Sequence, residues 1–217
     1  MNELTKPVTA RGIEAGDSKD LQLPRTLLIQ KTAKLVDEGC KPGTIINTLT
    51  KEIINPVFIP LVMFKYWDLY APEGDKMVYR GRVIDKNDPK LEGRKFYGDA
   101  EGKATAVSVI AFISLIDMRP MVVAFSKSSY GAGKKLYTMA TMAKRDLFSL
   151  KYKLKVVSKT NKHATYFVLD VEPAGETSEP EYIEAESYYR SFSQIKMDKP
   201  ALDSEAVELR DGAPSDW

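Results

Sequence analysis

The sequence predicts a mainly β protein of the α+β class, built on an OB-fold-like five-stranded barrel with flanking helices. Five stretches that are apolar or alternate between apolar and polar residues are separated by turn signals rich in Gly, Pro, Asn and Asp. A stretch with helical spacing, residues 131–145, lies between the third and fourth of them. A helix inserted between strands 3 and 4 of a five-stranded core is the connectivity of an OB-fold.

The composition is that of a folded domain of ordinary polarity. The 217 residues are 43% hydrophobic and 29% charged, which is enough for one core. We expect residues 23–195 to form that domain, residues 1–22 to be a flexible arm and residues 196–217 to be a mobile acidic tail.

Residue usage also bounds the chemistry. The single cysteine excludes an intramolecular disulfide, and the single histidine makes a zinc site or a His-based catalytic pair hard to build. No signal peptide and no apolar run of about 20 residues is found. We therefore expect a cytoplasmic protein that uses no metal, no cofactor and no membrane.

A helical pair is expected before the first strand. Apolar residues recur at helical spacing over residues 25–38, and Gly39 can end that helix. The same spacing recurs over residues 42–54. The Asn55-Pro56 pair then breaks the second helix.

Strands and two further helices follow. Residues 57–71 are rich in β-branched and aromatic residues, and Pro60 within them predicts an edge position or a bulge. The remaining elements are a short strand pairing back at 77–84, a polar loop at 85–104, a hairpin of strands 106–118 and 121–126, a helix at 131–145 capped by Ser128 and Ser129, strands at 149–159 and 164–172, and a terminal helix at 181–192.

The segment from Lys127 to Lys162 carries most of the functional signal. It holds ten Lys or Arg residues against one acid, Asp146, whereas residues 166–217 hold thirteen Asp or Glu against four Lys or Arg. A segment with so much charge of one sign must face water or a polyanion.

A glycine-rich stretch in this segment, Gly131 to Lys135, invites comparison with a phosphate-binding loop. With Gly133 and Lys134 fixed on the Walker A pattern, Ser128 stands where the first glycine belongs and Lys135 where the hydroxyl belongs. Either the glycines ease entry into a helix with solvated lysines, or the helix start holds a nucleic-acid phosphate with Lys134 and Lys135.

Lysines alternate along the strand at 149–159. Lys151, Lys153 and Lys155 place three ammonium groups on one sheet face about 7 Å apart, close to the phosphate spacing of an extended single strand. For three lysines alone, a solvated outer face is the simpler interpretation. Nearby aromatic residues favour a role in nucleic-acid binding, because proteins that bind single strands combine a basic groove with aromatic rings on which bases stack.

The aromatic residues lie on the strand at 57–71. Alternation places Phe58, Phe64, Tyr66 and Tyr70 on one face, and Ile59, Leu61, Met63, Trp67 and Leu69, with Lys65, on the other. The face with Tyr66 and Tyr70 is the candidate platform, although both faces of this strand could equally be buried.

The sequence offers little evidence for a set of catalytic residues. Asp68, Asp117 and Asp170 lie near predicted strand ends, where a metal-dependent nuclease would hold carboxylates, but capped turns explain them as well. Cys40 and His163 have no recognisable partner and are interpreted as structural. We expect a protein that is not an enzyme.

The acidic C-terminal segment is a candidate partner-binding tail. Asp211, Asp216 and Trp217 combine carboxylates with a terminal aromatic ring, which suits a basic, apolar pocket on another protein. The same charge can compete with DNA for a basic groove.

Three motifs carry a resemblance to a known group. FIPLVMFKYW (58–67), SSYGAGKKLYTMA (128–140) and YFVLDVEPAG (166–175) occur in this order, and over roughly residues 57–190 the chain resembles small proteins of tailed phages and prophages. In architecture it resembles the single-stranded DNA-binding proteins of tailed phages, which have an OB-fold core and an acidic tail ending in an aromatic residue. Two features depart from that class: the tail here is less acidic, and the N-terminal helical pair is additional.

The resemblance implies sequence-independent coating of single-stranded DNA during phage replication or recombination, in the cytoplasm of a bacterial host. It also implies that the tail contacts replication or recombination proteins. A structural or interaction protein, whose basic segment meets the acidic segment of a neighbouring copy, is the first alternative, and a metal-dependent nuclease is the second. The residues expected to bind nucleic acid are Lys65, Tyr66, Tyr70, Lys127, Tyr130, Lys134, Lys135, Lys151, Lys153 and Lys155.

Overall fold

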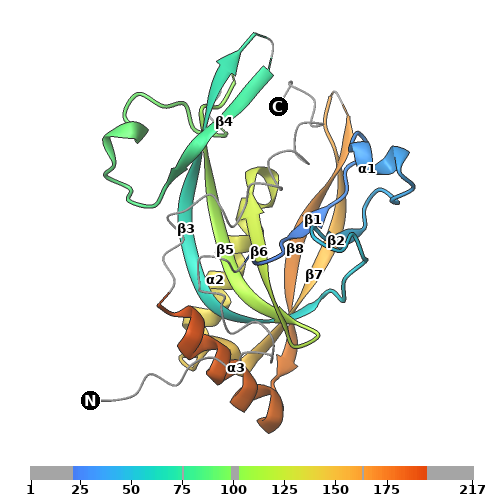
Figure 1. Cartoon of the computed structure of the whole chain (residues 1–217), viewed down its shortest axis with the longest axis vertical. Coiled ribbons are helices and arrows are strands. Elements are labelled where there is room, and N and C mark those ends of the chain that lie inside the picture. Colours follow the sequence, from blue (N-terminus) through green and yellow to red (C-terminus); the bar gives the residue numbers. More distant parts are fainter. Residues whose placement is uncertain (1–21, 75, 99–102, 163, 195–217) are drawn as a thin grey trace, which may run out of the picture.

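The computed structural model describes residues 22–74, 76–98, 103–162 and 164–194, and its main feature is one antiparallel sheet (Figure 1). The strand order is β6-β5-β3-β7-β8, with β4 beside β3. The strands are β3 (Val57–Glu73), β4 (Lys76–Val83), β5 (Ala106–Ile116), β6 (Arg119–Ser126), β7 (Leu150–Thr160) and β8 (Thr165–Glu176). The mainly β, α+β class predicted from the sequence is therefore confirmed.

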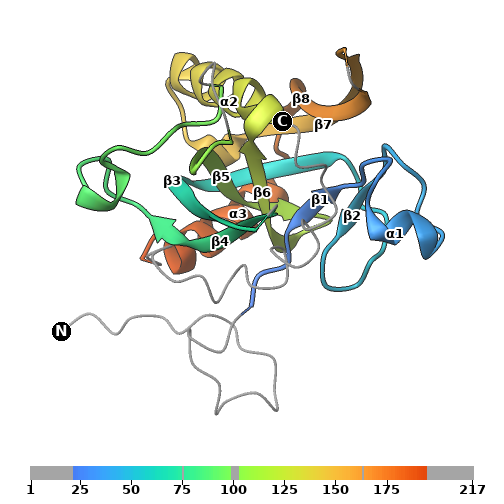
Figure 2. The same ribbon diagram turned by 90° about the horizontal axis from the view of Figure 1, so that it is seen from above.

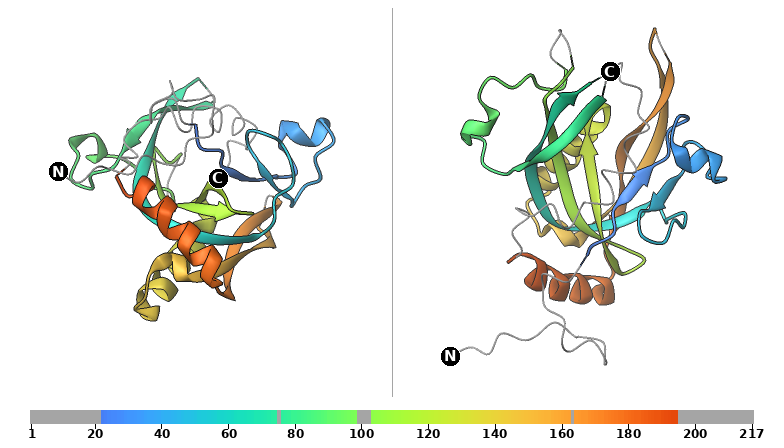
Figure 3. Two further views of the ribbon diagram at one scale, coloured as in Figure 1. Left: turned by 60° about the horizontal axis from the view of Figure 1, so that its bottom comes forward. Right: turned by 45° about the horizontal axis from the view of Figure 1, so that its top comes forward.

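Strand β3 is the central strand of this sheet and pairs with three other strands. Residues 59–69 pair with β5, residues 67–73 pair with β4, and Val57 and Phe58 pair with β7. Figure 3 shows β3 curving from the β4–β5 side of the sheet to the β7–β8 side. The predicted pairing of β4 with β3 is confirmed.

A bulge interrupts β3 beside Pro60. The register with β5 shifts between Pro60 and Val62, so Leu61 is the extra residue. The bulge predicted from Pro60 is confirmed. One extra residue reverses which side chains face which side, so Leu61 packs in the core with Tyr66, whereas Phe58 packs in the opposite core with Met63. The face assignment predicted for Phe58, Ile59 and Leu61 was therefore wrong.

Two helices cover opposite faces of the sheet. Helix α2 (Tyr130–Ala143) packs Ala132 and Leu136 into the core that contains Phe112. Helix α3 (Glu179–Phe192) packs Ala185 and Phe192 into the other core. Figure 2 shows α2 on one side of the sheet and β1 on the other.

The two helices begin differently. Ser129 precedes α2 but makes no side-chain cap, and its Oγ instead accepts a hydrogen bond from the Leu169 amide at 2.9 Å. The predicted serine cap of α2 was wrong, because β8 takes that hydroxyl. At α3 the Glu181 carboxylate accepts hydrogen bonds from the amide and hydroxyl of Ser178, at 2.7 and 2.9 Å.

Short 3₁₀ turns complete the chain between these elements. They are η1 (Pro89–Leu91), η2 (Lys127–Ser129) and η3 (Leu147–Ser149). The β5–β6 hairpin closes through Asp117 and Met118, both at positive φ (49° and 58°), as a two-residue turn requires.

The predicted N-terminal helical pair is wrong. The structure has β1 (Thr26–Leu28), a one-turn α1 (Lys34–Asp37) and β2 (Ile45–Asn47), and β1 pairs antiparallel with β2. Ile45 and Ile46 are both buried but belong to different cores, so a short strand buried on both faces imitated helical spacing. Leu49 and Ile53, which would have continued the helical stripe, are 55% and 72% exposed.

The sheet is an open path, so the closed five-stranded barrel is not formed by the described strands. Residues 24–30 span the gap between its edge strands, β6 and β8 (Figure 1). At one end the Val122 amide donates to the Pro24 carbonyl at 2.8 Å, and Arg25 forms a parallel bridge with Val122. At the other end the Gln30 side chain bonds to the Phe167 backbone. No helix in the described part of the chain is long and apolar enough to cross a membrane.

Candidate functional site

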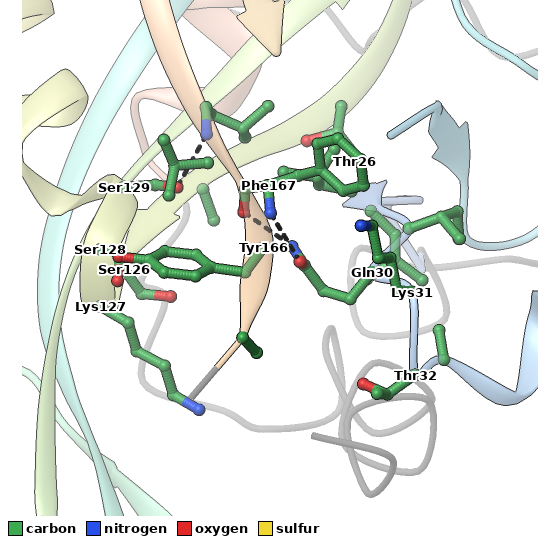
Figure 4. A pocket seen from close by; sticks show the side chains of 18 of the residues that line it. Thr26, Gln30, Lys31, Thr32, Ser126, Lys127, Ser128, Ser129, Tyr166 and Phe167 are labelled. Carbon is green, nitrogen blue, oxygen red and sulfur yellow. Dashed lines mark hydrogen bonds between the residues drawn. The ribbon is translucent and has the colours of Figure 1, made fainter. Parts of the chain in front are cut away.

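A cleft lies where the gap between β6 and β8 is not filled. Its cavity has a volume of about 250 Å³. Figure 4 shows Lys127 and the serines of the β6–η2 corner on one wall, and Gln30, Lys31 and Thr32 on the other. Four parts of the chain line the cleft. They are residues 26–33, Tyr97, the end of β6 with η2 (residues 124 and 126–129), and residues 164–169.

The charged side chains that line the cleft are all positive. The lining contains Lys31 and Lys127 and no Asp or Glu. Eight of its side chains carry a hydroxyl: Thr26, Thr32, Tyr97, Ser126, Ser128, Ser129, Thr165 and Tyr166. A cavity with two ammonium groups, many hydroxyl donors and no carboxylate favours an anion.

Aromatic rings add a second property. Tyr166 reaches from β8 toward Ser128 and Lys127 (Figure 4). The Tyr97 hydroxyl lies 3.0 Å from Ser128 Oγ, which holds its loop against the cleft. The ring of Phe167 packs against Gly43, so closely that a Cβ built on Gly43 would lie 3.2 Å from the ring. The other aromatic rings of the lining are those of Tyr97 and Tyr166, both half-buried.

Backbone groups of β6 also face the cleft. The Val122 amide points away from β5, because it donates to Pro24. Strand geometry repeats every second residue, so the amide and carbonyl groups of Ala124 and Ser126 point the same way, into the cleft that both residues line.

Lys127 is the predicted nucleic-acid contact that lines this cleft. It is exposed and has a positive φ of 49°, at the corner where β6 turns into η2. Tyr130 lies one turn further, with Lys134 Nζ 5.1 Å from its ring centroid. The structure thus brings Lys127 to the cleft and leaves Tyr130 and Lys134 on the adjoining helix start.

The prediction that Tyr66 stacks a base is wrong, because the Tyr66 side chain is fully buried. The Arg82 guanidinium lies 3.6 Å from its ring centroid, and Arg25 donates to its hydroxyl at 3.4 Å. Arg82 in turn forms an ion pair with Asp68 at 3.1 Å, both side chains being at most 2% exposed.

The other predicted residues of β3 lie nearer the surface. Tyr70 is half-buried, with its ring edge-on to that of Tyr79 at 5.9 Å. Lys65 is exposed, with its Nζ 5.4 Å from the Trp67 ring centroid. Neither residue lines the cleft.

Three lysines of β7 and α2 are paired with acids of their own chain. Lys135 bonds Asp170, Lys151 bonds Glu181 and Lys155 bonds Glu172, each at 3.0 Å. The Glu172 carboxylate, as hydrogen-bond acceptor and as charge, raises the pKa of Lys155. Lys153 is exposed and stands opposite Glu172 in the strand register. This face is thus close to neutral rather than a basic stripe.

Two carboxylates of this face are held in their charged form. Burial raises the pKa of Asp170, but the Lys135 ammonium, the Val171 amide and the Lys155 charge outweigh it, so the net pKa is lowered. The Ser178 amide and then Lys151 lower the pKa of Glu181.

The three aspartates considered for a metal are dispersed. Asp68 pairs with Arg82, Asp170 pairs with Lys135, and Asp117 accepts a hydrogen bond from Asn55 at 2.9 Å. No group of three or more His, Cys, Asp or Glu side chains that could hold a metal occurs among the residues described. Cys40 is a free, half-buried thiol beside the small core of Ile29, Leu35 and Ile46.

Some predictions fall on residues outside the described ranges. They are the arm at 1–21, His163, and the tail with Asp211, Asp216 and Trp217. The tail therefore stays a prediction.

Sequence reasoning missed Lys31, Tyr97 and Tyr166. Tyr97 follows Arg94 and Lys95 in the loop before β5, and Tyr166 follows the basic turn after β7, so a search for aromatic residues beside basic loops finds both. Lys31 was placed on a helix that does not exist, so no pattern could bring it to this cleft.

Together these features define an α+β protein with a large, open antiparallel sheet and a basic, hydroxyl-rich cleft between the edges of that sheet. The family model described as "Pam3 phage gp34-like protein" matches residues 3–198, and the chain belongs to that family, so it is a phage-type protein. Searches of curated proteins and of solved structures returned no significant match.

Proposed function

We propose that the cleft binds single-stranded nucleic acid without sequence preference, and that single-stranded DNA is the ligand. The supporting observation is the lining itself, which combines two lysines, no acid and two tyrosine rings. Single-strand binders combine positive charge along the backbone with aromatic rings on which bases stack. A phosphate would lie near Lys127 or Lys31, and a base would stack on Tyr166 or Tyr97.

The fold supports the same proposal. With β4 set aside, the long strands follow one another as β3, β5, β6, β7 and β8, with α2 between the third and the fourth. We propose that this sheet is an OB-fold core opened between β6 and β8, since OB-folds are partly open barrels. OB-folds bind oligonucleotides on strands 2 and 3 and on loops 1–2 and 4–5. Here strand 3 is β6, Tyr97 lies in loop 1–2, and Ala164 ends loop 4–5; all three contribute to the cleft.

In this proposal the protein coats single strands during phage DNA replication or recombination in the host cytoplasm and performs no chemistry on them. The acidic tail would recruit replication or recombination proteins. Membership of a phage family supports the setting. The first alternative, a basic segment that needs a neighbour's acids, is weakened because Lys135, Lys151 and Lys155 already pair within the chain.

The proposal is tested by fluorescence anisotropy with a labelled oligothymidine of about 30 nucleotides and with its duplex, at several salt concentrations. We expect preference for the single strand, with log affinity falling by about 0.7 per phosphate contacted for each unit of log salt. Absence of binding at low salt, or an affinity that does not change with salt, would refute the proposal.

A further inference from the structure

The side chain of Gln30 takes the place of a neighbouring strand at the edge of β8. Its Nε2 donates to the Phe167 carbonyl at 2.8 Å, and its Oε1 accepts from the Phe167 amide at 3.0 Å (Figure 4). These are the two hydrogen bonds that one residue of a paired strand would exchange with Phe167.

The bonded groups belong to an open edge. Strand β8 is the last strand of the sheet order, so its outward backbone groups have no strand partner in the described sheet. Two residues further along, the outward Leu169 amide donates to Ser129 Oγ. Side chains from opposite walls of the cleft, Gln30 and Ser129, thus hold the β8 backbone at successive outward positions.

Tyr166 is attached beside this clamp. It directly precedes Phe167, and its ring extends toward Lys127 across the cleft (Figure 4). A ring binds a base more tightly when its position is fixed beforehand, because less conformational entropy is lost on binding. Without the clamp, the edge at Phe167 exchanges its bonds with water, and the segment from Thr165 to Phe167 moves more freely.

We infer that Gln30 is a positioning residue for ligand binding: its amide fixes the β8 edge and so holds Tyr166 against Lys127. This inference rests on the proposed function, because Tyr166 is taken to stack a base. Edge protection alone, the structural alternative, requires the same two hydrogen bonds but no effect on affinity.

The test compares Gln30→Met with Gln194→Met. Methionine has a similar length and cannot form either bond, while Gln194 is an exposed residue after α3. Amide hydrogen exchange at Phe167 reports the clamp, and exchange at Val168, whose amide points to β7, is the internal reference. Oligothymidine affinity over a salt series reports function. Gln30→Asn, which keeps the amide but is one methylene too short, is the second variant.

We expect faster exchange at Phe167 in both Gln30 variants, unchanged exchange at Val168, and affinity about tenfold weaker, as when much of one stacking contact is lost. The salt slope stays the same, because no phosphate contact is removed. Gln194→Met changes neither measurement.

Three results would overturn the inference: unchanged exchange at Phe167, faster exchange with unchanged affinity, or a changed salt slope. The second leaves the proposed function standing. If the unsubstituted protein does not bind the oligonucleotide, the proposed function and this inference fail together, and that is distinguishable from failure of the inference alone.

Discussion

The molecule has two basic surfaces, and they differ in what surrounds the lysines. The cleft contributes Lys31 and Lys127 with no acid in its lining. The β7 face contributes more lysines, but those at 151 and 155 are each bonded to a glutamate at 3.0 Å. The surface with fewer lysines is thus the one whose lining carries no carboxylate.

The difference follows from topology. Strand β8 returns beside β7 and brings Asp170 and Glu172 alongside its lysines. The cleft instead collects side chains from segments that approach across a gap between sheet edges, and none of them contributes a carboxylate. The number of lysines in a segment therefore predicts its electrostatic potential poorly when an acidic strand pairs with it.

The largest expected effect is on ligand binding at the cleft. Replacing Lys127 by Gln and Tyr166 by Ala together should weaken oligothymidine binding about 100-fold, because a stacked base contributes about 1–3 kcal/mol and a phosphate contact is lost as well. Lys153→Gln on the β7 face is the matched control and should change affinity little. Equal losses in the two proteins, measured by anisotropy, would abolish the distinction between the surfaces.

The second prediction concerns the glycines of α2, which joins the two surfaces. A Cβ on Gly133 would lie 2.9 Å from Phe125 Cβ and 3.0 Å from Ile110 Cβ, whereas one on Gly131 meets open space. Gly133→Ala should lower the free energy of unfolding by about 1–3 kcal/mol through overpacking. Gly131→Ala should raise it by up to about 1 kcal/mol through helix propensity.

Urea denaturation measures both variants. Close packing of α2 on β5 and β6 then explains the glycine at 133, with no phosphate-binding role for it. If both substitutions left stability intact but abolished oligonucleotide binding, the glycines would belong to a phosphate site instead.

A smaller effect is expected when the β7 face is made basic. Glu172→Gln removes the carboxylate bonded to Lys155. We expect the pKa of Lys155 to fall toward its ordinary value, which NMR titration can follow, and single-strand affinity at low salt to rise a few-fold with a steeper salt slope. An affinity that stays constant would show that the ligand never reaches this face.

The smallest effect concerns acid stability. The folded pKa of Glu181 is lowered by the Ser178 amide and by Lys151, so its contribution is present above the unfolded pKa and is lost as pH falls through the folded pKa. Glu181→Gln keeps a capping-box acceptor and removes only the charge, so it should cost about 0.3–1 kcal/mol near neutral pH. The free energies of unfolding of the unsubstituted protein and of Glu181→Gln, measured by urea denaturation at several pH values, should converge in acid. A constant difference at all pH values would mean that the charge contributes nothing.

The region from β3 to α3 was predictable from the sequence because its signals are local. The alternating strands, the turn at Asp117 and the helix at Glu179–Phe192 all occur where expected. Residues 25–54 were not predictable, since Ile45 and Ile46 are buried on opposite faces of a short strand and this mimics a helix.

The site was predictable only in part for a related reason. Charge alone pointed to Lys127, which lines the cleft. Tyr66 was chosen from strand alternation, which cannot show that Arg82 covers its ring. Tyr166 reaches the cleft only because Gln30 and Ser129 bring distant segments to one edge, and that arrangement is a property of the fold.

The pairing of β3 has a consequence for synthesis on the ribosome. Val57 pairs with Lys153, 96 positions later (153 − 57), while the other end of the same strand pairs with its neighbour β4. The hairpins β3–β4 and β5–β6 can form early, but the start of β3 waits for β7 to emerge. Such long-range pairing slows folding. During that interval the apolar side chain of Phe58 lacks its partner Tyr152, and transiently exposed apolar surface of this kind makes a folding intermediate prone to aggregation.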